Sequence, residues 1–243
     1  MSAVLRIRLV TAAAVLTAYE AAARSGLFYQ GVFPPLGAVG RALAATLAAP
    51  QFYANLEVTA TEIAAGFAIG AVLGVPAGVA LGAGPRLRAA FAPYVDAFAT
   101  APKVIWLPIA MLALGAGPAS KAALAAAAAF FPIVIAVAAG TRHVPAVYVR
   151  VARVAHASAW QRLRWVYLPA LRVPIVTGLR LGFGLAVTIV LLAEIKISDR
   201  GAGFLVIDAY NHFRIAEMDA LLIVLFALAV AANGAMGRLA EET

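Results

Sequence analysis

Long apolar runs, separated by short polar or basic segments, dominate the sequence. A helix needs about twenty apolar residues to cross the hydrocarbon core of a bilayer, so runs of this length predict membrane spans. Six spans are expected, at about residues 9–23, 53–81, 89–113, 119–140, 171–194 and 219–237. The pattern therefore predicts an all-α, polytopic membrane protein in which residues 1–243 form a single transmembrane domain.

Two segments differ from the other expected spans. Residues 36–49 follow two prolines and include Arg41, so this stretch is too short and too charged to span, and an interfacial helix is expected. The first apolar run follows Arg6 and Arg8 and resembles the charged start and apolar middle of a signal peptide. Because five further apolar runs follow, we expect an uncleaved first span.

The composition indicates that lipid is the solvent. Apolar residues make up 64% of the 243 positions and charged residues 12%, with a mean hydropathy of +0.94, whereas soluble domains are about half apolar and a quarter charged. The net charge of +8 is spread between the apolar runs. We interpret it as a topology signal and as attraction to anionic membrane lipid, and we expect no nucleic-acid binding. The absence of cysteine excludes disulfides and thiolate chemistry.

Basic residues are unequally divided between the two sides of the expected spans. One side includes both termini and the basic loop 141–170, and the other side includes Lys121 and Lys196. The first side carries the excess of arginines. The positive-inside rule therefore predicts that both termini and the loop 141–170 lie in the cytoplasm.

The second expected span contains glycines at a strict four-residue period. This spacing puts them on nearly one face of a helix, where small residues let another helix approach closely. We expect this face to pack tightly against a neighbouring helix, and a face that slides during a transport cycle would have the same pattern. The glycines are Gly66, Gly70, Gly74, Gly78 and Gly82.

The third expected span carries prolines at 93, 102 and 108, each of which removes a backbone donor and favours a kink. Broken helices at membrane depth are tolerated where they face protein or a water-filled cavity, so this segment is a candidate lining for a pathway. Charged residues inside spans are costly and mark candidate functional positions, although pairing or snorkelling also explains them. Our pathway candidates are Lys103, Asp96 and Glu194.

Residues 144–169, VPAVYVRVARVAHASAWQRLRWVYLP, form an amphipathic and basic segment between the fourth and fifth spans. Apolar positions at helical spacing predict two short helices, separated by the small residues Ala157, Ser158 and Ala159. Leu168-Pro169 is expected to end the second helix, since a residue before proline is disfavoured in the α region. Such a loop suits docking into a groove of a soluble partner, or binding to anionic headgroups.

This segment resembles the cytoplasmic EAA loop of binding-protein-dependent ABC importer permeases. When the two are aligned on Leu168-Pro169, Arg150-Val151-Ala152 falls on the family's Glu-Ala-Ala triplet and His156 on its glycine, so only Ala152 of the triplet is retained. The resemblance implies that residues 150–163 contact the ATPase. The expected coupling residues are Arg150, Val151, Ala152, Ala155, His156, Ala157, Ser158, Ala159, Trp160, Leu163 and Pro169.

The resemblance extends along nearly the whole chain and is strongest to the nitrate, sulfonate and taurine branch. Glu62 departs from the branch, which usually has arginine four residues before the Gly66 position. The landmarks include Gly66-Phe67, Ala101-Pro102 through Leu107-Pro108, Gly115-Ala116-Gly117 with Ser120-Lys121, Phe130-Phe131-Pro132-Ile133, Gly178-Leu179-Arg180-Leu181 and, after Glu194, Gly201-Ala202-Gly203-Phe204-Leu205.

Membership of this family would imply the type I importer permease arrangement in a bacterial inner membrane. The implied partners are a second permease copy, most simply in a homodimer, a dimer of ATPase subunits and a periplasmic solute-binding protein. The chain has no Gly-x-x-x-x-Gly-Lys-Ser/Thr phosphate loop. We therefore expect no enzymatic activity and no bound cofactor in this chain, with ATP and Mg held by the partner ATPase.

The resemblance suggests a small anion such as nitrate, taurine or an alkanesulfonate as solute. A thiamine-precursor pyrimidine or riboflavin is the alternative within the branch. An intramembrane hydrolase is disfavoured because the histidines lie in loops and no Gly-x-Ser-x-Gly elbow occurs. A passive channel is disfavoured by the docking loop.

Overall fold

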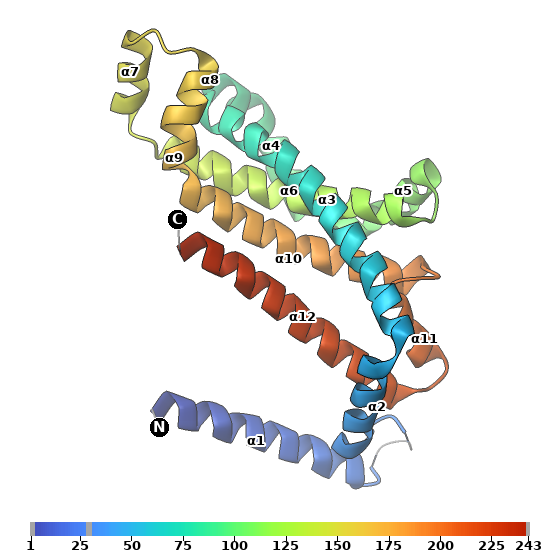
Figure 1. Ribbon diagram of the computed structural model, residues 1–243. Helices are drawn as coiled ribbons and strands as arrows, with labels where there is room; N and C mark the ends of the chain where they lie inside the picture. The colour runs from blue at the N-terminus through green and yellow to red at the C-terminus, as the bar shows by residue number, and fades with distance from the viewer. Residues whose placement is uncertain (1–2, 28–30, 242–243) are drawn as a thin grey trace.

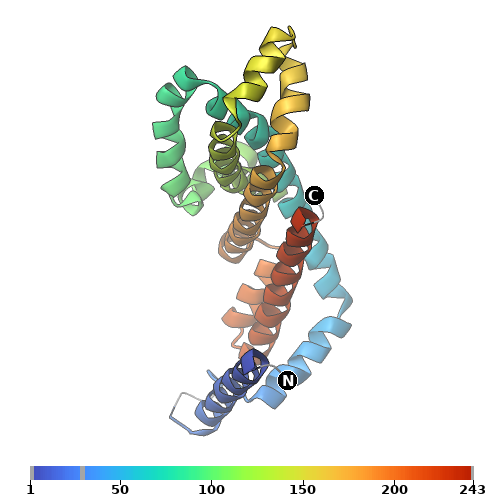
Figure 2. The same cartoon turned by 90° about the vertical axis from the view of Figure 1, so that its left-hand side faces the viewer.

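The computed structural model describes residues 3–27 and 31–241, and within these ranges every regular element is a helix. The all-α prediction is confirmed. A cytoplasmic position is predicted for both ends of the chain. These ends, residues 1–2 and 242–243, lie outside the described residues. The body consists of the long helices α3 (Pro50–Ala83), α6 (Pro118–Arg142), α10 (Arg172–Ile197) and α12 (Ile215–Glu241). The start of α1 (Ala3–Arg24), the end of α12 and the loop after α6 lie toward the same end of these helices (Figures 1 and 2).

Prolines begin several of the helices. Pro50, Pro85 and Pro118 each stand in the first turn of a helix, namely α3, α4 (Pro85–Thr100) and α6. A proline costs nothing at the first helical position, where its missing N–H would have no partner within the helix and its fixed φ suits the helix. The apolar sequence is therefore divided into helices by residues that favour helix starts.

The glycines of α3 let it pack closely against α6. Gly66 faces Ala125, Gly70 faces Ala129, and Gly74 faces Ile133, and a Cβ added to any of the three would lie within about 3 Å of α6 atoms. Gly78 and Gly82 continue the series against Val137 and Thr141. Each glycine faces the residue 59 positions later, the same separation that joins the hydrogen-bonded pair Glu62 and Lys121. A constant offset means that α3 and α6 run parallel.

The segment between α3 and α6 must therefore return the chain to the end where α3 began. It is α4, a single 3₁₀ turn η1 (Lys103–Trp106) and α5 (Leu107–Leu114), and the two halves are bent by 91°. The break lies at Ala101 and Pro102, both of which have extended backbone angles. A residue before proline is disfavoured in the α region, which explains the break. The expected kinked helix over 89–113 is in fact two helical pieces.

The number of membrane spans differs from the expected six. Among the described residues, four helices are long and apolar enough to cross a bilayer, and the bent pair would make a fifth. α1 is not among them because its 22 residues include Arg6, Arg8, Glu20 and Arg24. Its apolar stretch is thus shorter than the thickness of the bilayer core requires. The count of six is not confirmed.

The segment after Pro35 is helical, as expected, and forms α2 (Leu36–Ala48), which packs against α12. Its position at the membrane interface stays a prediction. The carboxylate of Glu20 in α1 accepts a hydrogen bond from the Leu36 N–H at 2.8 Å. Because the first amides of a helix have no partners within it, this contact caps α2 and joins it to α1.

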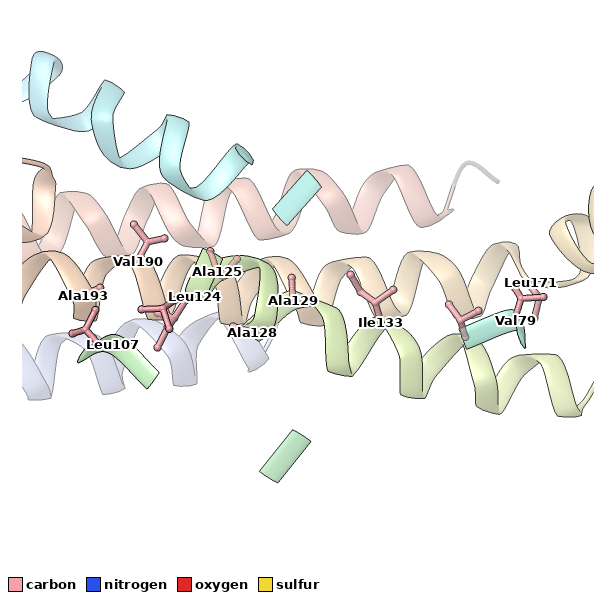
Figure 3. Close-up of a cluster of buried hydrophobic side chains, with 13 residues drawn as sticks. Val79, Leu107, Leu124, Ala125, Ala128, Ala129, Ile133, Leu171, Val190 and Ala193 are labelled. Atoms are coloured by element: carbon pink, nitrogen blue, oxygen red, sulfur yellow. The ribbon is translucent and has the colours of Figure 1, made fainter. Parts of the chain in front are cut away.

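The main hydrophobic core lies where α6 and α10 run alongside each other (Figure 3). Ile133 of α6 is fully buried, and Gly178 and Gly182 of α10 approach it closely. A second cluster joins the start of α3 to α12 and to α11 (Ala202–Asn211), the helix between α10 and α12. The rest of the long helices expose large apolar side chains, as a surface that contacts lipid or a further protein chain would.

The loop after α6 contains α7 (Ala146–Val154) and α8 (Ala159–Arg162), so the prediction of two short helices is confirmed. The prediction that Leu168-Pro169 ends the second helix is wrong. From α8 the chain continues through a π-helical turn, η2 (Leu163–Tyr167), and α9 (Leu168–Ala170) to a turn at Leu171. The Leu168 N–H bonds five residues back to the Leu163 oxygen. The wider turn accommodates a proline that cannot donate.

Candidate functional sites

The loop between α6 and α10 is fixed at its base. Leu171 is fully buried, and Val144, Leu163 and Tyr167 pack against the main core from the two sides of the loop. The parts farther from the core, around Val154 and Trp160, are exposed. The loop is therefore a projecting element on a rigid support.

His156 closes the first helix of this loop in a left-handed conformation, with φ of 54°. The Ala157 N–H donates to the Ala152 oxygen at 2.9 Å, and the His156 N–H donates to the Arg153 oxygen at 3.0 Å. These two bonds define a Schellman motif, whose left-handed position usually holds glycine. His156 thus occupies the backbone position that a glycine would suit best.

Ser158 begins the second helix with a capping box. Its Oγ accepts a hydrogen bond from the Gln161 N–H at 3.2 Å, and the Gln161 Oε1 accepts from the Ser158 N–H at 2.7 Å. Arg162 donates from its guanidinium to the Ala157 oxygen at 3.0 Å. Side chains therefore satisfy the backbone groups on both sides of the break between α7 and α8, and these bonds restrict the angle between the helices.

The projecting loop exposes several large apolar side chains. Val154 is 80% exposed, Trp160 64% and Trp165 68%. A groove of about 540 Å³ lies between α7 and the η2–α9 segment. It is lined by Tyr148, Val151, Ala152, Trp165, Val166, Pro169 and Ala170. Exposed aromatic and aliphatic residues beside the arginines of α7 and η2 form a surface of the type that packs against another protein.

Most of the coupling residues expected from the sequence are exposed on this loop, and three are not. Ala152, Ala157 and Leu163 are half-buried, and Leu163 belongs to the anchored base. Pro169 lies on the opposite wall of the groove from Val151. The exposed positions are Arg150, Val151, Ala155, His156, Ser158, Ala159, Trp160 and Pro169.

A second cluster of polar side chains is buried between α3, α6, α10 and the start of α11. The Lys121 Nζ lies 3.0 Å from the Glu62 Oε1, and the two side chains are 3% and 0% exposed. Glu194 is fully buried and accepts from the Thr59 hydroxyl and from the Gly203 N–H, both at 2.7 Å. This cluster ties the end of α10 to α3 and α6.

The turn from α10 into α11 is held by the same cluster. The Gly201 N–H donates to the Asn55 Oδ1 at 2.7 Å, and the Ala202 N–H donates to the Thr59 Oγ1 at 2.8 Å. Gly201 has a φ of 105°, and a Cβ there would overlap the Glu194 carboxylate. The first amides of α11 thus find their partners in side chains of α3 and α10.

The three pathway candidates have different surroundings. Glu194 lies within the buried cluster, with a hydrogen bond to each carboxylate oxygen. Asp96 is exposed on α4. Lys103 is half-buried just after the break in the third apolar segment, donates to the Ala99 oxygen and lies 5.3 Å from the centre of the Phe131 ring. Of the three, Lys103 is the one that is partly exposed and lies next to the break between α4 and η1.

Sequence reasoning missed the buried pair. It placed Lys121 on the flank of a span, whereas Lys121 is buried and bonded to Glu62. A signal for the pair was available: Glu62 stands four residues before Gly66 and so extends the glycine face of α3. Lys121 stands four residues before Ala125 on the facing side of α6.

Comparison with known sequences identifies the family. Residues 70–240 match the family described as the binding-protein-dependent transport system inner membrane component. The chain belongs to this family. Among the members of this permease family, the nitrate import permease of Synechocystis sp. is 36% identical over 173 residues, which cover 71% of this chain and 62% of that protein. The chain therefore spans less than two thirds of the length of that relative.

Two further comparisons support the assignment. The taurine transport system permease of Escherichia coli is 31% identical over 228 residues, 91% of this chain and 80% of that protein. A chain of the MetNI methionine ABC transporter in an inward-facing conformation has a TM-score of 0.67 with this permease-family chain at 20% identity. The superposition covers 79% of this chain and 95% of that chain, and it shows a common fold.

Proposed function

We propose that this chain is the membrane-spanning permease subunit of an ATP-driven importer for a small solute. The observation that carries the proposal is the match of residues 70–240 to the family of binding-protein-dependent inner membrane components. The relatives at 36% and 31% identity, named for nitrate import and taurine transport, are of the same kind. Energy would come from a separate ATPase that holds ATP and Mg, since this sequence has no phosphate loop.

The projecting loop is the proposed contact with that ATPase. Its capped helices present exposed Val154 and Trp160 on a support anchored by Leu171, which suits insertion of a short helix into a groove of a partner. Binding to a lipid surface would need neither a groove nor a fixed angle between the two helices. The shaped groove and the capped break between α7 and α8 favour a protein partner.

Disulfide cross-linking tests this contact cleanly because the chain has no cysteine of its own. A Trp160→Cys variant, expressed with its partner ATPase, is expected to form a disulfide with a cysteine introduced into the ATPase groove. Addition of ATP is expected to change the yield of this cross-link. Leu112→Cys is the matched control, since Leu112 is 90% exposed on α5. Equal cross-linking from both positions would remove the loop from the interface.

Coupling is tested separately from assembly. Substituting Ala157 with Glu puts a bulky charge at the half-buried turn of the loop, and it is expected to abolish substrate-stimulated ATP hydrolysis in a complex that still purifies intact. Arg200→Glu, at an exposed position of the α10–α11 turn, is the control. Unchanged stimulation in the Ala157 variant would contradict a coupling role.

The proposed assembly contains two permease chains, two ATPase subunits and a periplasmic solute-binding protein, in a bacterial inner membrane. The loop and both termini would face the cytoplasm by the positive-inside rule. Labelling Trp160→Cys in intact cells with a membrane-impermeant maleimide is expected to fail until the cells are opened. Labelling from outside would reverse the orientation and contradict the importer proposal.

A small anion is the proposed solute class, with Lys103 as the residue of the pathway that attracts it. Lys103 follows the break in the third apolar segment and is half-buried, where a cation could meet an anion away from bulk water. A panel of nitrate, taurine, alkanesulfonates, pyrimidines and riboflavin, tested for ATPase stimulation with the cognate binding protein, identifies the solute. Lys103→Ala should reduce anion transport, and Lys103→Arg should retain it.

A further inference from the structure

The buried cluster contains three ionisable side chains whose charges do not balance. Glu62 of α3 and Lys121 of α6 are 0% and 3% exposed, and Glu194 of α10 is fully buried. If all three were ionised, the cluster would carry two negative charges and one positive charge. A net charge buried away from water is costly unless it is neutralised.

The hydrogen bonds leave one oxygen without a partner. Glu194 accepts from Thr59 with one carboxylate oxygen and from the Gly203 N–H with the other. The Glu62 Oε1 accepts from Lys121, whereas the Glu62 Oε2 has no partner among the residues that the structure describes. Thr59, which donates to Glu194, stands three residues before Glu62 in α3, so the two positions lie one turn apart on the same face of that helix and both carboxyl groups point into one cluster.

Among the described residues, no cation other than Lys121 lies against the Glu62 and Glu194 carboxyl groups. α3 contributes the neutral side chains of Asn55 and Thr59, α6 contributes Lys121, and α11 contributes the backbone amides that begin at Gly201. The basic residues nearest to Glu194 along α10 and its turn, Lys196 and Arg200, are exposed, as is the acidic Asp199 between them. Lys121 is thus the one positive side chain that the described residues place against the two carboxyl groups.

We propose that the Glu62 and Glu194 carboxyl groups bind one proton between them, so that together with Lys121 they form a neutral buried site. Two carboxylates that share one site cannot readily both ionise, and a proton on either removes the net charge. The proton also supplies the donor that the Glu62 Oε2 lacks. A metal ion fits the site less well, because hard cations take six or more oxygen ligands and the Thr59 hydroxyl already both donates and accepts.

Loss of this proton would act on the α10–α11 turn. Glu194 holds the Gly203 amide, and Thr59 links the Glu194 carboxylate to the Ala202 amide. The folded chain keeps a proton that ordinary carboxyl groups in the unfolded chain release, so its stability falls as the pH rises and this proton is lost. The site makes the packing of three helices sensitive to protonation.

Infrared spectroscopy of the full chain in detergent tests the proposal without any partner. The wild-type protein is expected to show the C=O band of an un-ionised carboxylic acid near neutral pH, shifted in D₂O. Glu62→Gln, which leaves Glu194 and Lys121 as a balanced pair, should lack this band. Asp219→Asn, at a partly buried carboxyl that accepts from Tyr19, is the control and should retain it.

Thermal unfolding supplies the second measurement. The wild-type midpoint should fall between acidic and alkaline pH, and the fall should be smaller in Glu62→Gln. Absence of the band in the wild-type protein would overturn the proposal even if the variant failed to fold. Persistence of the band in Glu62→Gln, or stabilisation of the wild type by sodium in place of a proton, would overturn it as well.

Discussion

The Lys121 ammonium of α6 and the Glu62 carboxylate of α3 meet 3.0 Å apart at one end of the glycine face, and both side chains are buried. The pair continues the series in which each α3 residue faces the α6 residue 59 positions later. An ion pair in this place joins the two helices at a single register. Its removal is therefore the first test of how the fold is held together.

Lys121→Met is expected to destabilise the chain by about 3–5 kcal/mol, because removal of one partner leaves buried carboxyl groups uncompensated. The double variant Glu62→Met with Lys121→Met should recover most of the loss. Denaturation in detergent, followed by the helical circular dichroism signal, measures both changes. Lys196→Met, at an exposed position, is the control and should change stability by less than about 0.5 kcal/mol.

Gly70→Ala is expected to cost about 1–3 kcal/mol, as overpacked cores do. The added Cβ would lie 2.8 Å from the backbone oxygen of Ala126, and backbone cannot move aside as a flexible side chain can. Gly184→Ala in α10 is the matched control, since an added Cβ there meets no atom within 4 Å. Equal stabilities for the two variants would contradict the close approach of α3 to α6.

Gly201 and Gly115 separate backbone strain from steric overlap. Both have positive φ, 105° and 82°, but a Cβ at Gly201 would overlap the Glu194 carboxylate, whereas one at Gly115 meets nothing within 4 Å. Gly115→Ala should cost about 1–3 kcal/mol for the backbone alone, because its φ of 82° and ψ of 172° lie in a region that essentially only glycine adopts. Gly201→Ala should cost more. If the two losses of thermal stability were equal, the Glu194 contact would contribute nothing to the turn.

His156→Gly is expected to stabilise the projecting loop by about 1 kcal/mol, because glycine adopts the left-handed conformation without the penalty of a side chain. Slower hydrogen exchange at the Ala157 amide, which donates to the Ala152 oxygen, would report the gain. Ser158→Ala should have the opposite effect, with a loss of about 1 kcal/mol from the capping box. Faster exchange in the glycine variant would contradict the motif.

Local patterns predicted the helices and the glycine face well, since helix length, proline position and a four-residue period are properties of neighbouring residues. The course of the third apolar segment was harder. Pro102 signals a break, but the 91° bend depends on the parallel packing of α3 and α6, which requires the chain to return between them. The prediction that the helix ends at Pro169 was wrong, because the π-helical turn just before it widens the helix and accommodates a proline without an N–H donor.

The buried cluster depended on contacts between distant positions. Thr59 and Glu194 are 135 residues apart, and Asn55 and Gly201 are 146 apart. No local pattern joins them. The left-handed backbone conformation of His156 could likewise not be predicted from the composition. The alignment of His156 with a family glycine was the one signal for an unusual backbone conformation at this position.

The fixed offset between α3 and α6 limits how the molecule can change shape. A displacement by one helical turn, about 5.4 Å, would put Glu62 opposite Gly117 or Ala125 and separate it from Lys121. The two helices should therefore move as one unit in any change of shape, and the bending should fall on the break at Ala101 and Pro102.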